Sequence, residues 1–159
     1  MDWKKVHIFA FYTVAAASLF YIQDKAFSSD AYFSPQDIKG RILRAIEESK
    51  ESIDIAVLDI TSNDILVALA KAKERGVFVR VVVDRKRALM KGPLSSLYKN
   101  KGFAIKVLIQ KGIMHNNFAI FDCKLLITGS YYWNENGSKF NCDNVILIEE
   151  TKLLMKYQR

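Results

Sequence analysis

The sequence predicts one α/β domain, in which a mixed, mostly parallel sheet is flanked by helices on both faces and is preceded by an N-terminal apolar segment. Three observations predict this architecture. The chain has 159 residues, of which 50% are hydrophobic and 26% charged, which suits one globular domain with its own core. Apolar runs of strand length alternate with amphipathic segments of helix length in the first half of the domain. A short basic start followed by an uncharged apolar run opens the chain.

The first 23 residues are predicted to be a signal peptide or a membrane anchor. Lys4 and Lys5 precede an uncharged apolar run at residues 8–22. Its 15 residues lie at the top of the signal-peptide range and just below the roughly 17–25 residues of a membrane-spanning helix. Both interpretations therefore stay open, as does an amphipathic helix on the membrane surface.

The N-terminal charges also predict where the domain lies. Because Lys and Arg favour the cytoplasmic side of a membrane, we expect the rest of the chain on the exported side, periplasmic or extracellular. It would be membrane-anchored there or, after cleavage, secreted. Residues 24–31 are polar and predict a linker, which leaves residues 32–159 as the domain.

The start of the domain predicts a short strand and an amphipathic helix. Tyr32 and Phe33 suit the strand, and Ser34 and Pro35 suit the N-cap and the first position of the helix. Side chains then recur at helical spacing on one face, with the charged residues mostly elsewhere. That face comprises Ile38, Ile42, Ala45, Ile46 and Ser49.

A βαβ unit is predicted next. Residues 52–60 are rich in Ile and Val and predict a strand, and Ser62 then caps a second helix that ends at Gly76. Residues 77–83 are apolar at nearly every position and close on Asp84. Such a run predicts a strand that is buried on both faces and parallel to the preceding strand.

Strands are predicted to dominate the second half of the chain. Residues 85–100 predict a third helix, interrupted at Gly92 and Pro93. The last residues begin an amphipathic pattern, which predicts at most a brief terminal helix. Four strand-length runs lie between them, at residues 103–109, 118–122, 125–128 and 145–148.

The charge of the chain favours anionic partners. The formal net charge is +7 and the isoelectric point is about 9.4, which suits nucleic acid, phospholipid headgroups or a phosphate-bearing small molecule. Basic residues that cluster between the βαβ unit and residue 112 form either a solvated surface or a rim that guides a substrate. They are Arg80, Arg85, Lys86, Arg87, Lys91, Lys99, Lys101, Lys106 and Lys111.

Two cysteines, Cys123 and Cys142, are too few for a disulfide scaffold. With one histidine outside the basic leader, they also make a poor zinc site. We expect two free thiols in the core, while export leaves a disulfide open.

The most informative stretch begins at His115 and continues through Asn117 and Asp122 to Gly129 and Ser130. These residues resemble the phospholipase D superfamily motif, His-x-Lys-x4-Asp-x6-Gly-Ser. Four of its five defining positions match at the right spacing, which we estimate to occur by accident in fewer than roughly one in a thousand chains of this length. The resemblance covers about residues 32–150 and is to the single-motif branch, which is nuclease-like or cardiolipin-hydrolase-like.

The chemistry of such a site needs an in-line nucleophile, positive charge on the nonbridging oxygens and an acid for the leaving alkoxide. A neutral imidazole can attack phosphorus to give a phosphohistidine, and a second, protonated imidazole can serve as the acid. One His115 cannot do both at once. The single motif therefore predicts a homodimer with a shared active site, and the scheme requires neither a metal nor another cofactor.

The resemblance implies a role for each matching residue. His115 would be the nucleophile or its acid partner, and Asp143, at a position where relatives have an acidic residue, would orient the histidine. Ser130, beside a flexible Gly129, would contact a phosphate oxygen, and Asp122 would help to set the charge balance. Tyr131 could stack on a base or insert among lipid tails, although packing is the commoner use of such a side chain. The predicted substrate contacts are Lys111, Gly129, Ser130, Tyr132 and Trp133.

Two departures from the family pattern affect the expected activity. Asn117 stands where the family has its phosphate-binding lysine, and Tyr132 stands where many relatives have asparagine. Losing one electrostatic stabiliser of a transition state typically costs about 10²- to 10³-fold in rate, and a dimeric site would lose two lysines. As written, the chain is predicted to be nearly inactive, whether Asn117 is natural or engineered.

The predicted function is that of a phosphodiesterase, an endonuclease-like hydrolase of single- or double-stranded nucleic acid that works through a phosphohistidine and is impaired by Asn117. A phospholipase D-type hydrolase of a lipid headgroup is the first alternative. The second is a noncatalytic module that binds nucleic acid or an anionic membrane, which the loss of the lysine favours. A polymer needs a long basic groove, whereas a lipid needs an apolar rim that faces the bilayer.

Overall fold

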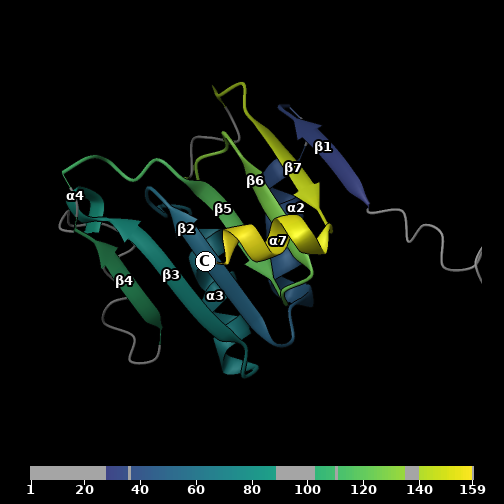
Figure 1. Cartoon of the computed structure of the whole chain (residues 1–159), viewed down its shortest axis with the longest axis horizontal. Helices are drawn as coiled ribbons and strands as arrows, with labels where there is room; N and C mark the ends of the chain where they lie inside the picture. Colours follow the sequence, from purple (N-terminus) through teal and green to yellow (C-terminus); the bar gives the residue numbers. More distant parts are fainter. Residues whose placement is uncertain (1–27, 36, 89–102, 110, 135–139, 159) are drawn as a thin grey trace, which may run out of the picture.

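A seven-stranded mixed sheet forms the centre of the fold (Figure 1). The computed structural model describes residues 28–35, 37–88, 103–109, 111–134 and 140–158. The strand order is β1-β7-β6-β5-β2-β3-β4. The strands are β1 (Ser29–Phe33), β2 (Ser52–Val57), β3 (Phe78–Asp84), β4 (Ala104–Leu108), β5 (Asn117–Phe121), β6 (Leu125–Gly129) and β7 (Asn144–Ile148).

The predicted βαβ unit is confirmed, because β2 pairs in parallel with β3. β3 pairs in parallel with β4, whereas β2–β5, β5–β6, β6–β7 and β7–β1 are antiparallel. The sheet is therefore mixed, as predicted, but antiparallel pairs outnumber parallel ones. β5, β6 and β7 follow one another along the chain, and each pairs with the next in the opposite direction; only the β5–β6 connection, residues 122–124, is short.

Helices cover both faces of the sheet, as predicted (Figure 1). Helices α2 (Ile38–Glu48) and α3 (Asn63–Glu74) bury their apolar faces in the main core against the sheet. The brief terminal helix α7 (Thr151–Tyr157) lies on the opposite face, where Leu154 packs with Ile120 and Leu126.

The prediction that β3 is buried on both faces is wrong. Val79, Val81 and Val83 point into the main core, but on the other face Phe78 is 57% exposed. On this open face Arg80 forms an ion pair with Asp54 of β2. The pair lines a groove of about 580 Å³ beside the end of α7. The short terminal helix leaves this part of the sheet uncovered in the described structure.

The entry into the first helix differs from the prediction. The N-cap of α2 is Asp37, whose carboxylate accepts a hydrogen bond from the Gly40 backbone N–H at 2.8 Å, so Ser34 and Pro35 precede the helix. Ser34 instead exchanges hydrogen bonds with Asp143. Strand β1 begins at Ser29 and so lies partly within the segment predicted to be a linker.

The remaining sequence predictions have mixed outcomes. Ser62 is the N-cap residue of α3, although its side chain makes no capping hydrogen bond. A third helix, α4 (Arg85–Ala88), starts where predicted, but the rest of the predicted range and the N-terminal segment fall outside the described residues. Cys123 and Cys142 are free but exposed, not in the core. None of the described helices is long and apolar enough to cross a membrane.

Candidate active site at one edge of the sheet

The ends of five strands bring most of the predicted site residues to one edge of the sheet. Val57, the last residue of β2, pairs with Asn117, the first residue of β5. Gly129, the last residue of β6, pairs with Val145 near the start of β7. β3 is parallel to β2 and therefore ends at the same edge, where it continues into α4 (Figure 1). His115, Asn117, Ser130 and Asp143 thus share this edge, which we call the site edge.

A buried carboxylate holds the backbone beside His115. Asp84, at the end of β3, is only 3% exposed and accepts a hydrogen bond from the Met114 backbone N–H at 3.1 Å. It also accepts one from the Lys86 backbone N–H at 2.8 Å. The Met114 bond, followed by bonds from the α4 backbone, holds the pKa of Asp84 below its usual range despite burial. In the sequence alone, Asp84 marks only the end of a strand.

Asn117 occupies the base of the site edge, between β2 and β6. Its side-chain Oδ1 is buried and has no hydrogen-bond partner among the described residues. A buried amide oxygen without a donor is unfavourable by about 1–3 kcal/mol unless a ligand or water supplies one. The position that carries a lysine in the motif is therefore occupied by a neutral side chain with an unused acceptor.

Ser130 and Asp143 form a hydrogen-bonded polar pair at the site edge. The Ser130 hydroxyl donates to Asp143 Oδ1 at 2.9 Å and accepts from the Asn144 backbone N–H at 3.0 Å. Asp143 is 8% exposed, and Ser34 binds its backbone from the other side. Asp143 Oδ2 has no partner among the described residues. It is therefore available to accept an imidazole N–H, although no hydrogen bond joins it to His115 in the described structure.

Gly129 allows the two strands of this pair to approach each other. A Cβ atom built on Gly129 would lie 2.1 Å from the Asn144 carbonyl oxygen and 2.8 Å from the Val145 Cα. No side chain fits there without moving the backbone of β7. The motif glycine thus serves a close approach of strands, where the sequence analysis expected flexibility.

Comparison with known proteins agrees with this geometry. Residues 42–159 match the family described as "Cardiolipin synthase, PLD-like domain", which is more than half of the chain. The chain belongs to the phospholipase D-like family. This confirms the resemblance seen in the motif.

Individual relatives of the phospholipase D-like family carry different names. A phospholipase D from Rickettsia prowazekii is 37% identical over 131 residues, covering 81% of this chain and 63% of the relative. A mitochondrial cardiolipin hydrolase from Mus musculus is 32% identical over 112 residues, covering 70% and 51%. The crystal structure of Nuc from Salmonella typhimurium, a phospholipase D family member, matches with a TM-score of 0.76 at 26% identity, covering 83% and 90%. The chain spans less than two thirds of the length of the phospholipase D and of the cardiolipin hydrolase.

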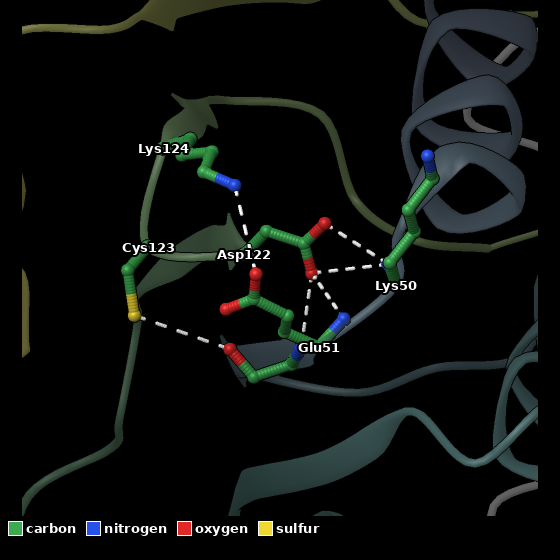
Figure 2. Close-up of polar contacts among 6 residues, drawn as sticks. Lys50, Glu51, Asp122, Cys123 and Lys124 are labelled. Carbon is green, nitrogen blue, oxygen red and sulfur yellow. Dashed lines mark hydrogen bonds and ion pairs between the residues drawn. The ribbon is translucent and has the colours of Figure 1, made fainter.

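Asp122 does not belong to the site edge, although it matches the family motif. It follows the far end of β5, seven residues from His115, which corresponds to about 20 Å of extended chain. Its carboxylate accepts hydrogen bonds from the backbone N–H groups of Lys50, Glu51 and Ser52 at 2.8–3.0 Å (Figure 2). Burial raises the pKa of Asp122, but these three bonds outweigh it and the pKa lies below its usual range. The motif aspartate therefore fastens the β5–β6 turn to the start of β2.

The predicted contact of Trp133 with substrate is also wrong. Trp133 is 2% exposed and Tyr131 is 1% exposed, and both pack in the main core. The Trp133 carbonyl accepts hydrogen bonds from the backbone N–H groups of Thr61 and Ser62. Tyr132, between the two aromatic residues, is half-buried, and Lys111 is exposed. Lys111 and Tyr132 thus remain candidates for substrate contact.

Sequence reasoning missed a further acidic residue, Asp59. It lies two residues beyond Val57, and His115 lies two residues before Asn117, so both extend past the same antiparallel Val57–Asn117 pair. Burial raises the pKa of Asp59 above its usual range, while the Ile60 backbone N–H and the charge of Arg87 act in the opposite direction. An aspartate two residues after the first β-strand of the βαβ unit was the available signal.

Proposed function

We propose that this chain is a phosphodiesterase domain that binds nucleic-acid phosphodiesters and, as written, hydrolyses them poorly because Asn117 replaces the motif lysine. The observation that carries the proposal is the meeting of His115, Ser130 and Asp143 at one edge of the sheet. Asp143 offers an acceptor to the imidazole, and the exposed His115 is accessible to a polymer.

The proposed reaction proceeds in two displacements. The neutral imidazole of His115 attacks phosphorus, so a P–N bond forms and the P–O bond to the leaving alkoxide breaks. The alkoxide takes a proton from a second, protonated imidazole. Water then attacks phosphorus in the phosphohistidine, so a P–O bond forms and the P–N bond breaks. The water gives its proton to the second imidazole, and both histidines return to their starting states. Asp143 Oδ2 would accept the remaining N–H of His115 and so fix its ring.

The second imidazole has to come from another chain. The described residues contain one histidine, His115, and the reaction needs a nucleophile and an acid at the same time. A twofold axis beside the site edge would bring His115 of the partner subunit to the phosphate and complete the site. The homodimer is thus part of the proposed mechanism.

Asn117 limits the proposed activity. The developing negative charge on the nonbridging oxygens would meet an amide in place of an ammonium, at a cost of about 10²- to 10³-fold for each missing cation. Binding should suffer less than turnover, because most of the basic residues remain. If the loss of the lysine abolishes turnover entirely, the chain is a noncatalytic module that only binds nucleic acid or an anionic membrane.

A lipid substrate is the second candidate, and one structural feature favours it. Ile109 is 74% exposed and Ile113 is 48% exposed, and they flank Lys111 just before His115. Exposed apolar side chains next to a cation suit the boundary between headgroups and acyl chains. The names of the cardiolipin hydrolases and the predicted N-terminal anchor, which would hold the domain at a membrane on the exported side, point the same way.

The deciding experiment is to assay Asn117→Lys against single-stranded DNA, RNA and anionic lipid vesicles in the presence of EDTA. Cleavage of nucleic acid that is lost in Asn117→Lys/His115→Ala would support the nuclease. Headgroup release from the vesicles alone would favour the lipid hydrolase. If no substrate is turned over but binding persists, the noncatalytic module is the better description.

A further inference from the structure

We propose that Asp84 is a positioning residue of this site, which holds His115 in place for attack on phosphorus through the backbone of Met114. The inference rests on the proposed function, because it assigns a role in the same reaction to a residue of the site edge. Asp84 lies outside the family motif, and no step of the proposed reaction uses it. Its side chain is nevertheless only 3% exposed, and burying a carboxylate is unfavourable unless its oxygens are hydrogen-bonded.

The segment that carries His115 crosses the end of β2. Val57, the last residue of β2, pairs with Val83 of β3 on one side and with Asn117 of β5 on the other. Asp84 directly follows Val83, and its Oδ2 accepts the Met114 backbone N–H at 3.1 Å. The segment before β5 therefore runs from β3 to β5 over the end of β2. Figure 1 shows it in green, passing from the side of α4 to the start of β5.

This crossing leaves the backbone of His115 little freedom. β3 and β5 are two strand spacings apart, roughly 10 Å, and the three residues of chain from Met114 to Asn117 span about the same distance when extended. Within the described structure, the Met114 N–H is the one group of residues 111–116 that forms a hydrogen bond. His115 is thus held on one side by Asp84, through Met114, and on the other by the pairing of β5 with β2.

The task requires a carboxylate, because two backbone segments meet at Asp84. Its Oδ1 accepts the Lys86 backbone N–H of α4 at 2.8 Å, while Oδ2 accepts the Met114 N–H. Both oxygens of an ionised carboxylate are acceptors, and such charge-assisted bonds are stronger than neutral ones. Asparagine has one acceptor oxygen and would place an amide donor against the other N–H. The Met114 bond is the longer of the two, so we expect Asp84→Asn to release the segment that carries His115.

The first test is steady-state kinetics in the Asn117→Lys background, with the phosphodiester that this variant cleaves. Asp84→Asn should lower kcat about tenfold or more, since a displacement of roughly 1 Å in an active site can cost about 10²-fold, and should change KM less than about twofold. Asp122→Asn is the matched control, because it also alters a carboxylate that binds backbone N–H groups, but at the far end of β5. The control should keep kcat within about twofold of the Asn117→Lys value.

The second test needs no activity and uses the full-length chain without Asn117→Lys. The backbone order parameter of His115, measured by ¹⁵N relaxation, should fall from about 0.85 to about 0.6 in Asp84→Asn and stay near 0.85 in Asp122→Asn. Thermal unfolding verifies that each variant is folded. If Asp84→Asn does not fold, Asp84→Ser takes its place, because the shorter hydroxyl sets no amide donor against either N–H and cannot bridge both.

The two tests separate the possible failures. If kcat falls equally in Asp84→Asn and Asp122→Asn, or does not fall in Asp84→Asn, Asp84 has only a structural role and the inference is wrong. An unchanged order parameter of His115 in Asp84→Asn, or an equal fall in Asp122→Asn, would also overturn it. If Asn117→Lys cleaves no phosphodiester, the proposed function fails, and the order parameter alone decides whether Asp84 holds His115 in place.

Discussion

Replacing Gly129 with alanine tests whether the approach of β6 to β7 holds the Ser130–Asp143 pair in place. The new Cβ would lie 2.1 Å from the Asn144 carbonyl oxygen, 2.8 Å from the Val145 Cα and 2.9 Å from the Asn144 carbonyl carbon. All three are backbone atoms of β7. The strands would have to move apart by about 1.3 Å before the shortest of these contacts reached the 3.4 Å of an ordinary van der Waals contact.

The expected cost follows from overpacking. Forcing a buried methyl group into occupied space typically destabilises a protein by about 1–3 kcal/mol. For a chain of this size, that corresponds to a fall in Tm of roughly 3–10 °C. Because Asn144 also donates its backbone N–H to Ser130, the shift should disturb the site edge as well as the core.

Thermal and urea unfolding of Gly129→Ala measure this cost. Gly112→Ala is the matched control, because nothing lies within 4 Å of a Cβ at Gly112. The control should match the unaltered chain or exceed its stability slightly. If Gly129→Ala unfolds within about 0.5 kcal/mol of the unaltered chain, a range typical of neutral surface substitutions, the close approach does not constrain this glycine.

Three further predictions concern charge and assembly. Asp122→Asn should lower the free energy of unfolding at pH 7 by about 1–3 kcal/mol. The pKa of Asp122 is depressed in the folded state, so the stability difference between the two chains should be complete above the unfolded pKa of about 3.9. It should shrink as the pH falls through the lower folded-state pKa. A stability difference that stays constant down to pH 2 would contradict this prediction. Lys111→Gln should weaken binding of all single-stranded DNA sequences alike and should reduce the slope of log affinity against log salt concentration by about 0.7. Lys106→Gln, in the middle of β4, should have less effect. A loss of affinity that depends on the DNA sequence would argue against phosphate contacts by Lys111. Sedimentation should find a dimer, and a strict monomer at assay concentrations would remove the second histidine from the mechanism.

The sequence predicted well those features that depend on local patterns. The alternation of Ile- and Val-rich runs with an amphipathic helix was enough to predict the parallel pairing of β2 and β3. The motif spacing predicted His115 and Ser130 as site residues and also indicated the family. The spacing is informative because adjacent antiparallel strands bring residues at fixed spacings to one edge of the sheet. Asp143 followed from the resemblance, and the structure adds its hydrogen bond to Ser130.

The errors concern residues whose roles depend on distant partners. Asp122 matches the motif, but its role is set by three backbone N–H groups about seventy residues earlier in the chain. Trp133 follows the motif closely, yet the loop after β2 covers it and buries it in the core. Ser34 had the pattern of an N-cap but is bound by Asp143, more than a hundred residues away. Such pairings carry no local signal in a single sequence.

The rate of phosphodiester cleavage by Asn117→Lys, measured in EDTA against the unaltered chain, tests the central claim most directly. The claim is that His115, Ser130 and Asp143 supply a phosphodiesterase half-site with everything except the cation that the motif lysine would provide at position 117. It predicts a gain of about 10²-fold or more, which disappears when His115→Ala is added. An Asn117→Lys chain that keeps its fold and dimerises but cleaves no nucleic acid or phospholipid faster than the unaltered chain would contradict the claim.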